Sequence, residues 1–260
     1  MSDWTVDRAA TELLACEDER RERDPLTDEW PDLDVETAYA VQDEVLRRRL
    51  DRGERLVGVK LGLTSRAKQL RMGIAAPLTA WLTDAMVVPA GAPVPQERLI
   101  HPRAEPEIVF VLGRQLTGPG VTAVGAMRAV ADVCAGIEII DSRYRDFRFT
   151  LPDVIADNAS SAAFVTGPVL RSPEGLDLSL EACLLEVDGQ VVDSATGSAV
   201  QGHPAEALAL AANSLGVRGL SLEAGWLVLT GGMTDAVFLE PGHSVMASFT
   251  SLGSLVLSGG

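Results

Sequence analysis

The sequence predicts an α+β protein in which helices come first and a strand-rich region follows. Apolar residues recur at helical spacing in segments 4–23 and 34–53. From residue 55 onward, short apolar runs separated by glycine and proline are typical of strands. A chain of 260 residues is long enough for one large domain with an appended lobe. We therefore expect an N-terminal helical lobe at residues 1–54 and a larger, strand-rich domain at residues 55–260.

The composition excludes several classes of protein. With 37 acidic and 22 basic residues, the formal charge is −15, and such a surface repels the phosphates of nucleic acids. The first residues lack the basic leader and apolar core of a signal peptide, and no apolar run reaches the length of a membrane span. Cys16, Cys134 and Cys183 lie far apart and suit reduced thiols. We expect a cytoplasmic protein with no nucleic-acid or membrane partner.

The second helix has clear boundary signals. Asp34 is suited to cap it, and Gly53 is suited to end it. Residues 25–34 before it form a predicted loop that contains two prolines. Its inward-facing stripe is predicted to consist of Val35, Ala38, Tyr39, Gln42, Val45, Leu46 and Leu50.

A lysine and an aspartate stand out in the apolar segments that follow. Lys60 lies in the run at 55–63, where a lysine either reaches solvent from the edge of a strand or is a buried functional cation. The residues alone favour the first interpretation. A short helix is predicted at 67–72, and Asp84 follows between apolar residues.

Three glutamates lie within apolar, strand-like runs. Glu105 and Glu107 share one face of a strand because successive side chains alternate between faces, and Glu138 lies in a second such run, GIEIID. Converging carboxylates suit a hard divalent cation. The alternative is that they are solvated or that they pair with Arg103 and Arg143. The spacing leaves both interpretations open.

The rest of the chain alternates helices, loops and strands. We predict a helix that is capped by Thr122, runs to residue 134 and is stopped by Gly136. The loop 141–157 interleaves basic and aromatic residues, which suits a small anionic ligand, and ADNASS (156–161) either lines a site or forms an ordinary turn. Further predicted elements are a hairpin at Asp188-Gly189, a helix from Pro204 to Leu215 that stops at Gly216, and strands at 226–230, 245–249 and 255–257.

Several motifs occur in an order that resembles a known family. The motifs are GVKLGLT (58–64), HPRAEPEIVFVL (101–112), EIIDSRY (138–144), DVIADNASS (153–161), GHPAEALA (202–209), LTGGMT (229–234) and LGS (252–254). With them, the sequence is similar to the group of 2-oxopent-4-enoate hydratases and 4-oxalocrotonate decarboxylases in the fumarylacetoacetate hydrolase superfamily, over residues 34–257. The resemblance implies a mixed fold with a strongly bent β-sheet core, flanking helices and the N-terminal helical lobe.

The resemblance also implies roles for individual residues. It implies Mg²⁺ or Mn²⁺ held by Glu105, Glu107 and Glu138, and active-site roles for Lys60 and Asp84. It further places Ser161 near the substrate. Arg143 and Arg148, in the loop 141–157, are candidates for holding a substrate carboxylate, although the sequence does not fix where they point.

The two activities of this group share these motifs. The loop 141–161 and the segment LTGGMTDAV resemble the decarboxylase branch more closely, since hydratases tend to carry tryptophan where this chain has Phe147. We therefore predict metal-dependent decarboxylation of the small 2-oxo acid 4-oxalocrotonate to 2-oxopent-4-enoate and CO2, in aromatic meta-cleavage catabolism. The alternatives are hydration of 2-oxopent-4-enoate to 4-hydroxy-2-oxopentanoate, or a non-catalytic partner subunit of a hydratase. The resemblance also predicts a homo-oligomer and a complex with a hydratase.

Overall fold

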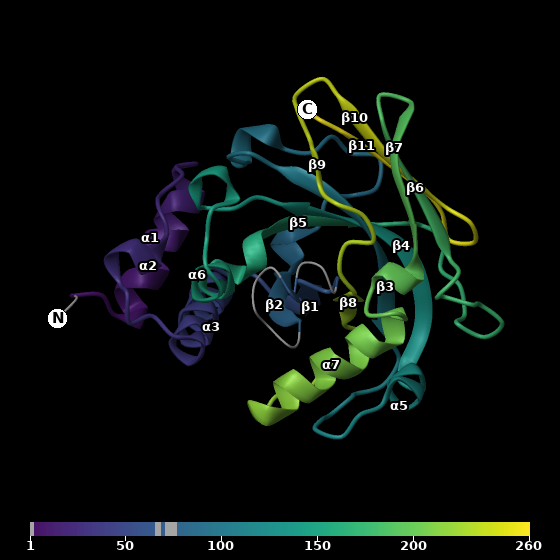
Figure 1. Ribbon diagram of the computed structural model, residues 1–260, viewed down its shortest axis with the longest axis horizontal. Helices are drawn as coiled ribbons and strands as arrows, with labels where there is room; N and C mark the ends of the chain where they lie inside the picture. Colours follow the sequence, from purple (N-terminus) through teal and green to yellow (C-terminus); the bar gives the residue numbers. More distant parts are fainter. Residues whose placement is uncertain (1–2, 66–68, 71–76) are drawn as a thin grey trace.

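The computed structural model, which describes residues 3–65, 69–70 and 77–260, contains a seven-stranded sheet in the order β2-β1-β8-β3-β4-β5, with β9 paired to β3. β1 and β8 are parallel, and the other neighbours are antiparallel. β4 curves strongly along one side of the molecule (Figure 1). The strands are β1 (Leu56–Gly62), β2 (Leu78–Thr83), β3 (Arg103–Leu112), β4 (Val130–Ile140), β5 (Ser161–Thr166), β8 (Leu227–Leu229) and β9 (Val237–Phe238).

A second, four-stranded sheet has the order β11-β10-β6-β7. Its hairpin turn confirms the prediction at Asp188-Gly189, because φ is 50° at Asp188 and 76° at Gly189, as a tight hairpin turn requires. In β10, residues alternate between buried and half-buried, so one face of this sheet covers the main core. The strands are β6 (Ala182–Val187), β7 (Gln190–Thr196), β10 (Ser244–Phe249) and β11 (Gly253–Ser258).

The N-terminal helices α1 (Val6–Asp18), α2 (Leu26–Glu29) and α3 (Val35–Asp51) lie together beside α6 (Leu151–Ala156) (Figure 1). Asp34 caps α3 as predicted, by accepting a hydrogen bond from the Thr37 backbone N–H. The predicted stripe is buried at its centre, whereas its ends, Val35 and Leu50, are 41% and 38% exposed. The segment 25–34 was predicted as a loop but contains the single turn of α2.

The predicted helix at 122–134 is wrong beyond its first turn. Thr122 does cap a helix, but α5 (Ala123–Met127) ends after five residues and β4 begins at Val130. The valines at 130 and 133 favour a strand, and the segment is held by ladder pairing with β3. Gly136 lies within β4, where an added Cβ would stand 2.4 Å from a methyl carbon of Val109. This glycine therefore permits close packing and does not stop a helix.

α7 (Pro204–Val217) begins at Pro204 as predicted and runs two residues past Leu215. Gly216 lies inside the helix and does not stop it. An added Cβ there would stand 2.3 Å from the Gly118 carbonyl carbon, so the close contact with the backbone at Gly118 requires glycine. The short helix predicted at 67–72 lies outside the described residues except at 69 and 70. Short single turns occupy Asp84–Met86, Gln96–Arg98, Arg145–Phe147, Asn158–Ser160 and Gly197–Ala199.

Among residues 3–65, 69–70 and 77–260, no helix has both the length and the apolar character that are needed to cross a membrane.

Candidate functional site

Three glutamate side chains converge where β3 and β4 lie side by side. Glu105 and Glu107 lie on one face of β3, and the ladder register places Glu138 of β4 directly opposite Glu105. All three are buried, and one oxygen from each lies within 4.8 Å of the others. The structure thus brings together the three carboxylates that the sequence singled out, in an arrangement that can hold a metal ion.

The surroundings of Glu107 indicate which kind of ion would fit. One of its oxygens accepts a hydrogen bond from the Gly231 backbone N–H at 2.7 Å, whereas Oε1 is buried with no hydrogen-bond partner among the described residues. Burial, followed by the nearby Glu138 and Glu105 carboxylates, raises the pKa of Glu107 well above its usual value. A divalent cation would offset this repulsion and bind the remaining oxygen, and an all-carboxylate donor set suits Mg²⁺ or Mn²⁺.

Gly231 and Gly232 let the backbone approach the carboxylates closely. An added Cβ at Gly231, where φ is 104°, would lie 2.1 Å from the Thr64 hydroxyl oxygen. At Gly232 it would lie 2.8 Å from an oxygen of Glu105. Both glycines in LTGGMT are therefore required, because no side chain fits at these positions beside the carboxylate cluster.

Lys60 is buried beside the same cluster. Its Nζ donates hydrogen bonds to Glu138 at 3.1 Å and to the Ala159 carbonyl oxygen at 2.8 Å. Only 3% of the residue is exposed, so the interpretation of Lys60 as a solvent-reaching lysine at a strand edge is wrong. β1 places it there because β8 alone separates β1 from β3 in the sheet.

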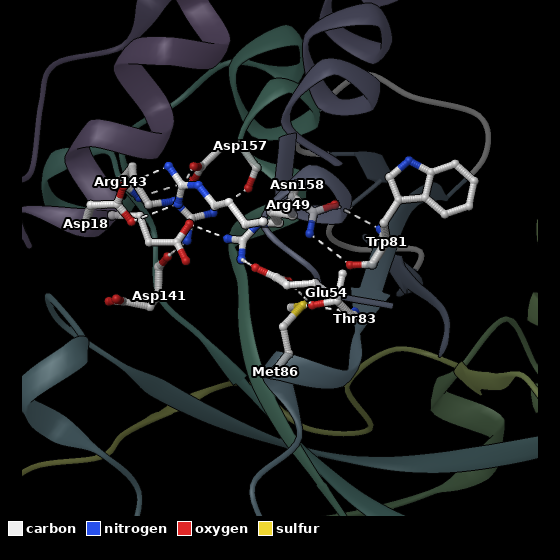
Figure 2. A network of polar contacts seen from close by, with 12 residues as sticks. Asp18, Arg49, Glu54, Trp81, Thr83, Met86, Asp141, Arg143, Asp157 and Asn158 are labelled. Carbon is white, nitrogen blue, oxygen red and sulfur yellow. Dashed lines mark hydrogen bonds and ion pairs between the residues drawn. The ribbon is translucent and has the colours of Figure 1, made fainter. Parts of the chain in front are cut away.

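A strained turn presents polar groups to Lys60 and Glu138. Asn158, Ala159 and Ser160 have φ values of 48°, 52° and 58°, a conformation that is uncommon outside glycine. The Asn158 amide stabilises the turn by bonding both the N–H and the carbonyl of Trp81, at 2.8 and 2.9 Å (Figure 2). As a result, Ala159 directs its carbonyl at Lys60, while Ser161, which starts β5, donates a hydrogen bond to Glu138 at 2.8 Å.

A cavity of about 600 Å³ adjoins the cluster, a volume in the range of small-molecule sites. Ser160 lines it with a hydroxyl oxygen that is buried and makes no hydrogen bond within the described part of the chain. Ser160 belongs to the polar segment ADNASS, for which the sequence left open whether it lines a site or forms an ordinary turn. The lining residues are Lys60, Gly62, Leu63, Leu78, Arg103, Glu105, Ile140, Phe147, Arg148, Phe149, Val154, Ala159, Ser160, Asp235 and Ala236.

The two arginines predicted to hold a carboxylate have different positions. Arg143 is buried, and its guanidinium pairs with the Asp157 carboxylate and donates to the Asp141 carbonyl at 2.7 Å (Figure 2). It does not line the 600 Å³ cavity. Arg148 does line it, but its exposed guanidinium lies 3.0 Å from Asp28. Arg148 is thus the better placed of the two for a ligand.

Asp84 is not brought to the carboxylate cluster. Its side chain accepts hydrogen bonds from the Arg55 backbone N–H and guanidinium, both at 2.8 Å. These bonds lower the pKa of Asp84, and the bond from the Arg55 backbone N–H is the largest cause. The β1–β2 ladder pairs Leu56 with Thr83 but Lys60 with Ala80, so Asp84 adjoins the end of the ladder remote from Lys60. A catalytic role for Asp84 stays a prediction, and the geometry gives it no support.

The raised pKa of Glu107 predicts how pH affects the metal-free protein. Because the folded state holds this proton more tightly than the unfolded chain, Glu107 should cost stability as pH rises above about 4.5, its unperturbed value, toward its folded pKa. In EDTA, the melting temperature of Glu107→Gln should therefore rise relative to that of the wild type as the pH increases from 4.5 to 8. Melting curves that keep a constant separation would contradict the pKa shift, and saturating Mg²⁺ should remove the cost from the wild type.

Comparison with known proteins places this site in context. A sequence model of the fumarylacetoacetate hydrolase C-terminal family matches residues 55–257. A 4-oxalocrotonate decarboxylase of Pseudomonas putida is 40% identical over 230 residues, 88% of this chain and 87% of the relative. A 2-hydroxyhexa-2,4-dienoate hydratase of Comamonas testosteroni is 43% identical over 215 residues, 82% of this chain and 81% of the relative.

A solved structure is similar over nearly the whole chain. It is a 4-oxalocrotonate decarboxylase from Pseudomonas putida G7, complexed with magnesium and adipate. The TM-score is 0.95 at 38% identity, and the match covers 97% of this chain and 96% of that one. The similarity confirms the predicted mixed fold and its bent sheet.

Proposed function

Because the chain belongs to the fumarylacetoacetate hydrolase family, we propose that it is a metal-dependent lyase that decarboxylates 4-oxalocrotonate to 2-oxopent-4-enoate and CO2. The observation that carries this proposal is the buried cluster of Glu105, Glu107 and Glu138 beside Lys60, at the wall of a cavity that fits a small acid. The decarboxylase relatives named above support the choice of reaction. The proposal assigns the enzyme to the meta-cleavage catabolism of aromatic compounds.

Glu105, Glu107 and Glu138 would hold Mg²⁺ or Mn²⁺ through their carboxylate oxygens. When bound, the ion supplies Lewis acidity to the 2-oxo acid end of the substrate. Ser161 donates a hydrogen bond to Glu138 and so orients this ligand, and Lys60 lies on the same carboxylate as a neighbouring positive charge. The chain's own contribution is thus a rigid set of oxygen donors with a fixed cation beside it.

Lys60 would stabilise the charge that develops in the reaction. As the C5–C6 bond of 2-oxohex-3-enedioate breaks, its electron pair forms C4=C5, the C3=C4 pair moves to C2=C3, and the carbonyl pair moves to the C2 oxygen. CO2 leaves, and protonation gives the dienol. A buried ammonium near the C2 oxygen would stabilise that oxyanion without reorganisation. The carbon skeleton itself delocalises the electrons, so no organic cofactor is required.

The apolar part of the cavity favours loss of CO2. Phe147, Phe149 and Val154 line the wall, together with Leu78. Side chains of this kind exclude water from this part of the cavity and suit the uncharged CO2 that leaves. This environment supports decarboxylation over addition of water.

Hydration of 2-oxopent-4-enoate to 4-hydroxy-2-oxopentanoate is the second candidate function. It is supported by the hydratase relative from Comamonas testosteroni at 43% identity. Addition of water needs a general base near C4 of the substrate. Among the cavity residues, Asp235 offers a carboxylate outside the metal cluster, so it is the group to test if hydration is observed.

We also propose that the enzyme is cytoplasmic and acts as a homo-oligomer in complex with a hydratase. The reduced state expected of Cys16, Cys134 and Cys183, which are all buried and unpaired, supports the location. The dienol product is the substrate of such a hydratase, which supports the complex. Size-exclusion chromatography with light scattering, with and without a co-expressed hydratase, measures both assemblies.

The purified protein should release CO2 from 4-oxalocrotonate in the presence of Mg²⁺, and EDTA should abolish the release. Stoichiometric CO2, measured alongside the loss of substrate absorbance, would establish the reaction. The same preparation is then given 2-hydroxypenta-2,4-dienoate. Rapid hydration without any CO2 release from 4-oxalocrotonate would replace the decarboxylase assignment by the hydratase one.

A further inference from the structure

Arg103 begins β3 on the face that carries the metal-ligand candidates. Residues 103, 105 and 107 alternate with residues that point to the opposite face, so Arg103 lies on the same side as Glu105 and Glu107. Its Cα is about 7 Å from that of Glu105, given the rise of two strand residues. Arg103 is therefore one step beyond the carboxylate cluster, on the side away from Glu107.

The guanidinium of Arg103 is fixed by aromatic rings. Its central carbon lies 4.1 Å from the centroid of the Phe147 ring and 4.5 Å from that of Phe238. β9 supplies Phe238 directly opposite Arg103 in the ladder. A guanidinium in contact with two rings has less freedom before any ligand arrives, so less further ordering would be needed on binding.

This cation lacks a carboxylate partner among the described residues. Arg103 is half-buried, whereas the more deeply buried Arg23 and Arg143 have carboxylate partners, Glu29 and Asp157. Arg103 instead has a buried Nε with no hydrogen-bond partner in the described ranges. Such a group is costly unless an anion is supplied to it. Because Arg103 lines the same cavity as Glu105 and Lys60, a ligand in that cavity can supply the anion.

The spacing suits a dicarboxylate of six carbons. Five C–C bonds of about 1.5 Å separate the two carboxyl carbons of such a chain by about 6 Å when it is extended. This length is close to the ~7 Å that separates the Cα atoms of Glu105 and Arg103. We propose that Arg103 binds the distal carboxylate of the substrate, the one that leaves as CO2, and so selects dicarboxylates over monocarboxylates. The identity of the leaving group rests on the proposed function, whereas the preference for a second carboxylate rests on geometry alone.

Arg103 is a specificity residue in this arrangement. A cation beside the leaving carboxylate stabilises the ground state, and the negative charge of the carboxylate disappears as CO2 forms. Arg103→Gln should therefore raise KM for 4-oxalocrotonate by ~10²-fold, the range expected for losing a charge-assisted hydrogen bond, without lowering kcat. Arg103→Lys should restore part of the loss.

Calorimetry tests the preference without turnover. The Mg²⁺-loaded protein is titrated with 2-oxohexanedioate and with 2-oxohexanoate, which differ only in the distal carboxylate. We expect the wild type to prefer the diacid by ~10²-fold and Arg103→Gln to lose that preference while binding the monoacid equally well. Arg218→Gln is a matched control, because the Arg218 guanidinium also stacks on two rings, Tyr39 and Trp81, but lines no part of this cavity.

Three outcomes would overturn the inference: an unchanged preference in Arg103→Gln, an equal loss for both ligands, or transfer of the effect to Arg148→Gln. The proposed function fails separately. A protein that shows the Arg103-dependent preference but releases no CO2 would refute decarboxylation and leave the assignment of Arg103 standing.

Discussion

Replacement of Lys60 by methionine is expected to lower kcat by ~10²-fold or more, the effect of removing one preorganised electrostatic donor. The methionine retains much of the length of the side chain but has no charge. Since Lys60 Nζ lies 3.1 Å from Glu138, its positive charge also opposes a metal ion held by that carboxylate. The variant should therefore bind Mg²⁺ at least as tightly as the wild type. Stopped-flow turnover and calorimetric Mg²⁺ titration measure the two effects.

This combination separates a catalytic role from a structural one. If Lys60 only maintained the cluster, its loss would weaken Mg²⁺ binding and turnover together. A folded Lys60→Met protein with wild-type kcat would reject the catalytic role. Lys60→Arg serves as the control that retains the positive charge. The guanidinium is larger than the ammonium group, so this variant should recover activity only if the guanidinium fits beside the Ala159 carbonyl.

The second large effect is expected for Glu107→Gln. Loss of one anionic ligand from a cluster of three should weaken Mg²⁺ binding by ~10²-fold or more and reduce activity at limiting Mg²⁺ accordingly. The backbone contact from Gly231 can persist, because the amide oxygen still accepts that hydrogen bond. Calorimetric titration and the Mg²⁺ dependence of the rate provide the measurement.

Glu186→Gln is the matched control, because it makes the same chemical change on a half-buried residue of β6, in the other sheet. Its Mg²⁺ affinity should equal that of the wild type. If Glu107→Gln bound Mg²⁺ normally, the cluster would not be the metal site, and the buried Oε1 of Glu107 would require another explanation.

The sequence predicted those parts of the site that depend on local periodicity. Alternation along one strand was enough to place Glu105 and Glu107 on a common face. The register that sets Glu138 opposite Glu105 depends on pairing between distant segments, and the sequence suggested it only through the family motif. The burial of Lys60 was likewise invisible, because a run of apolar residues around a lysine is the same in an edge strand and an inner strand.

The differences between what the sequence suggested and what the fold shows have a common physical cause. Residues 122–134 have helical spacing, yet pairing with β3 outweighs the local preference. The sequence left the direction of Arg143 open, and its buried guanidinium pairs with the carboxylate of Asp157, whose position only the fold defines. Asp84 has apolar neighbours in the sequence, and its partner Arg55 lies across the ladder. In each case the decisive contact joins residues that are not sequence neighbours.

The strained turn at 158–160 has a consequence for how this enzyme can change. Asn158 bonds the backbone of Trp81, and the Trp81 indole N–H in turn donates to Asp43 of α3 at 2.9 Å. Gln42, its neighbour, donates to the Thr79 and Ile155 carbonyls. Hydrogen bonds therefore connect the N-terminal helices to the turn whose Ala159 carbonyl accepts a hydrogen bond from Lys60. Recombination that exchanged residues 1–54 for an unrelated segment would leave these backbone and indole groups unpaired, so this part of the chain must be inherited together with the catalytic machinery.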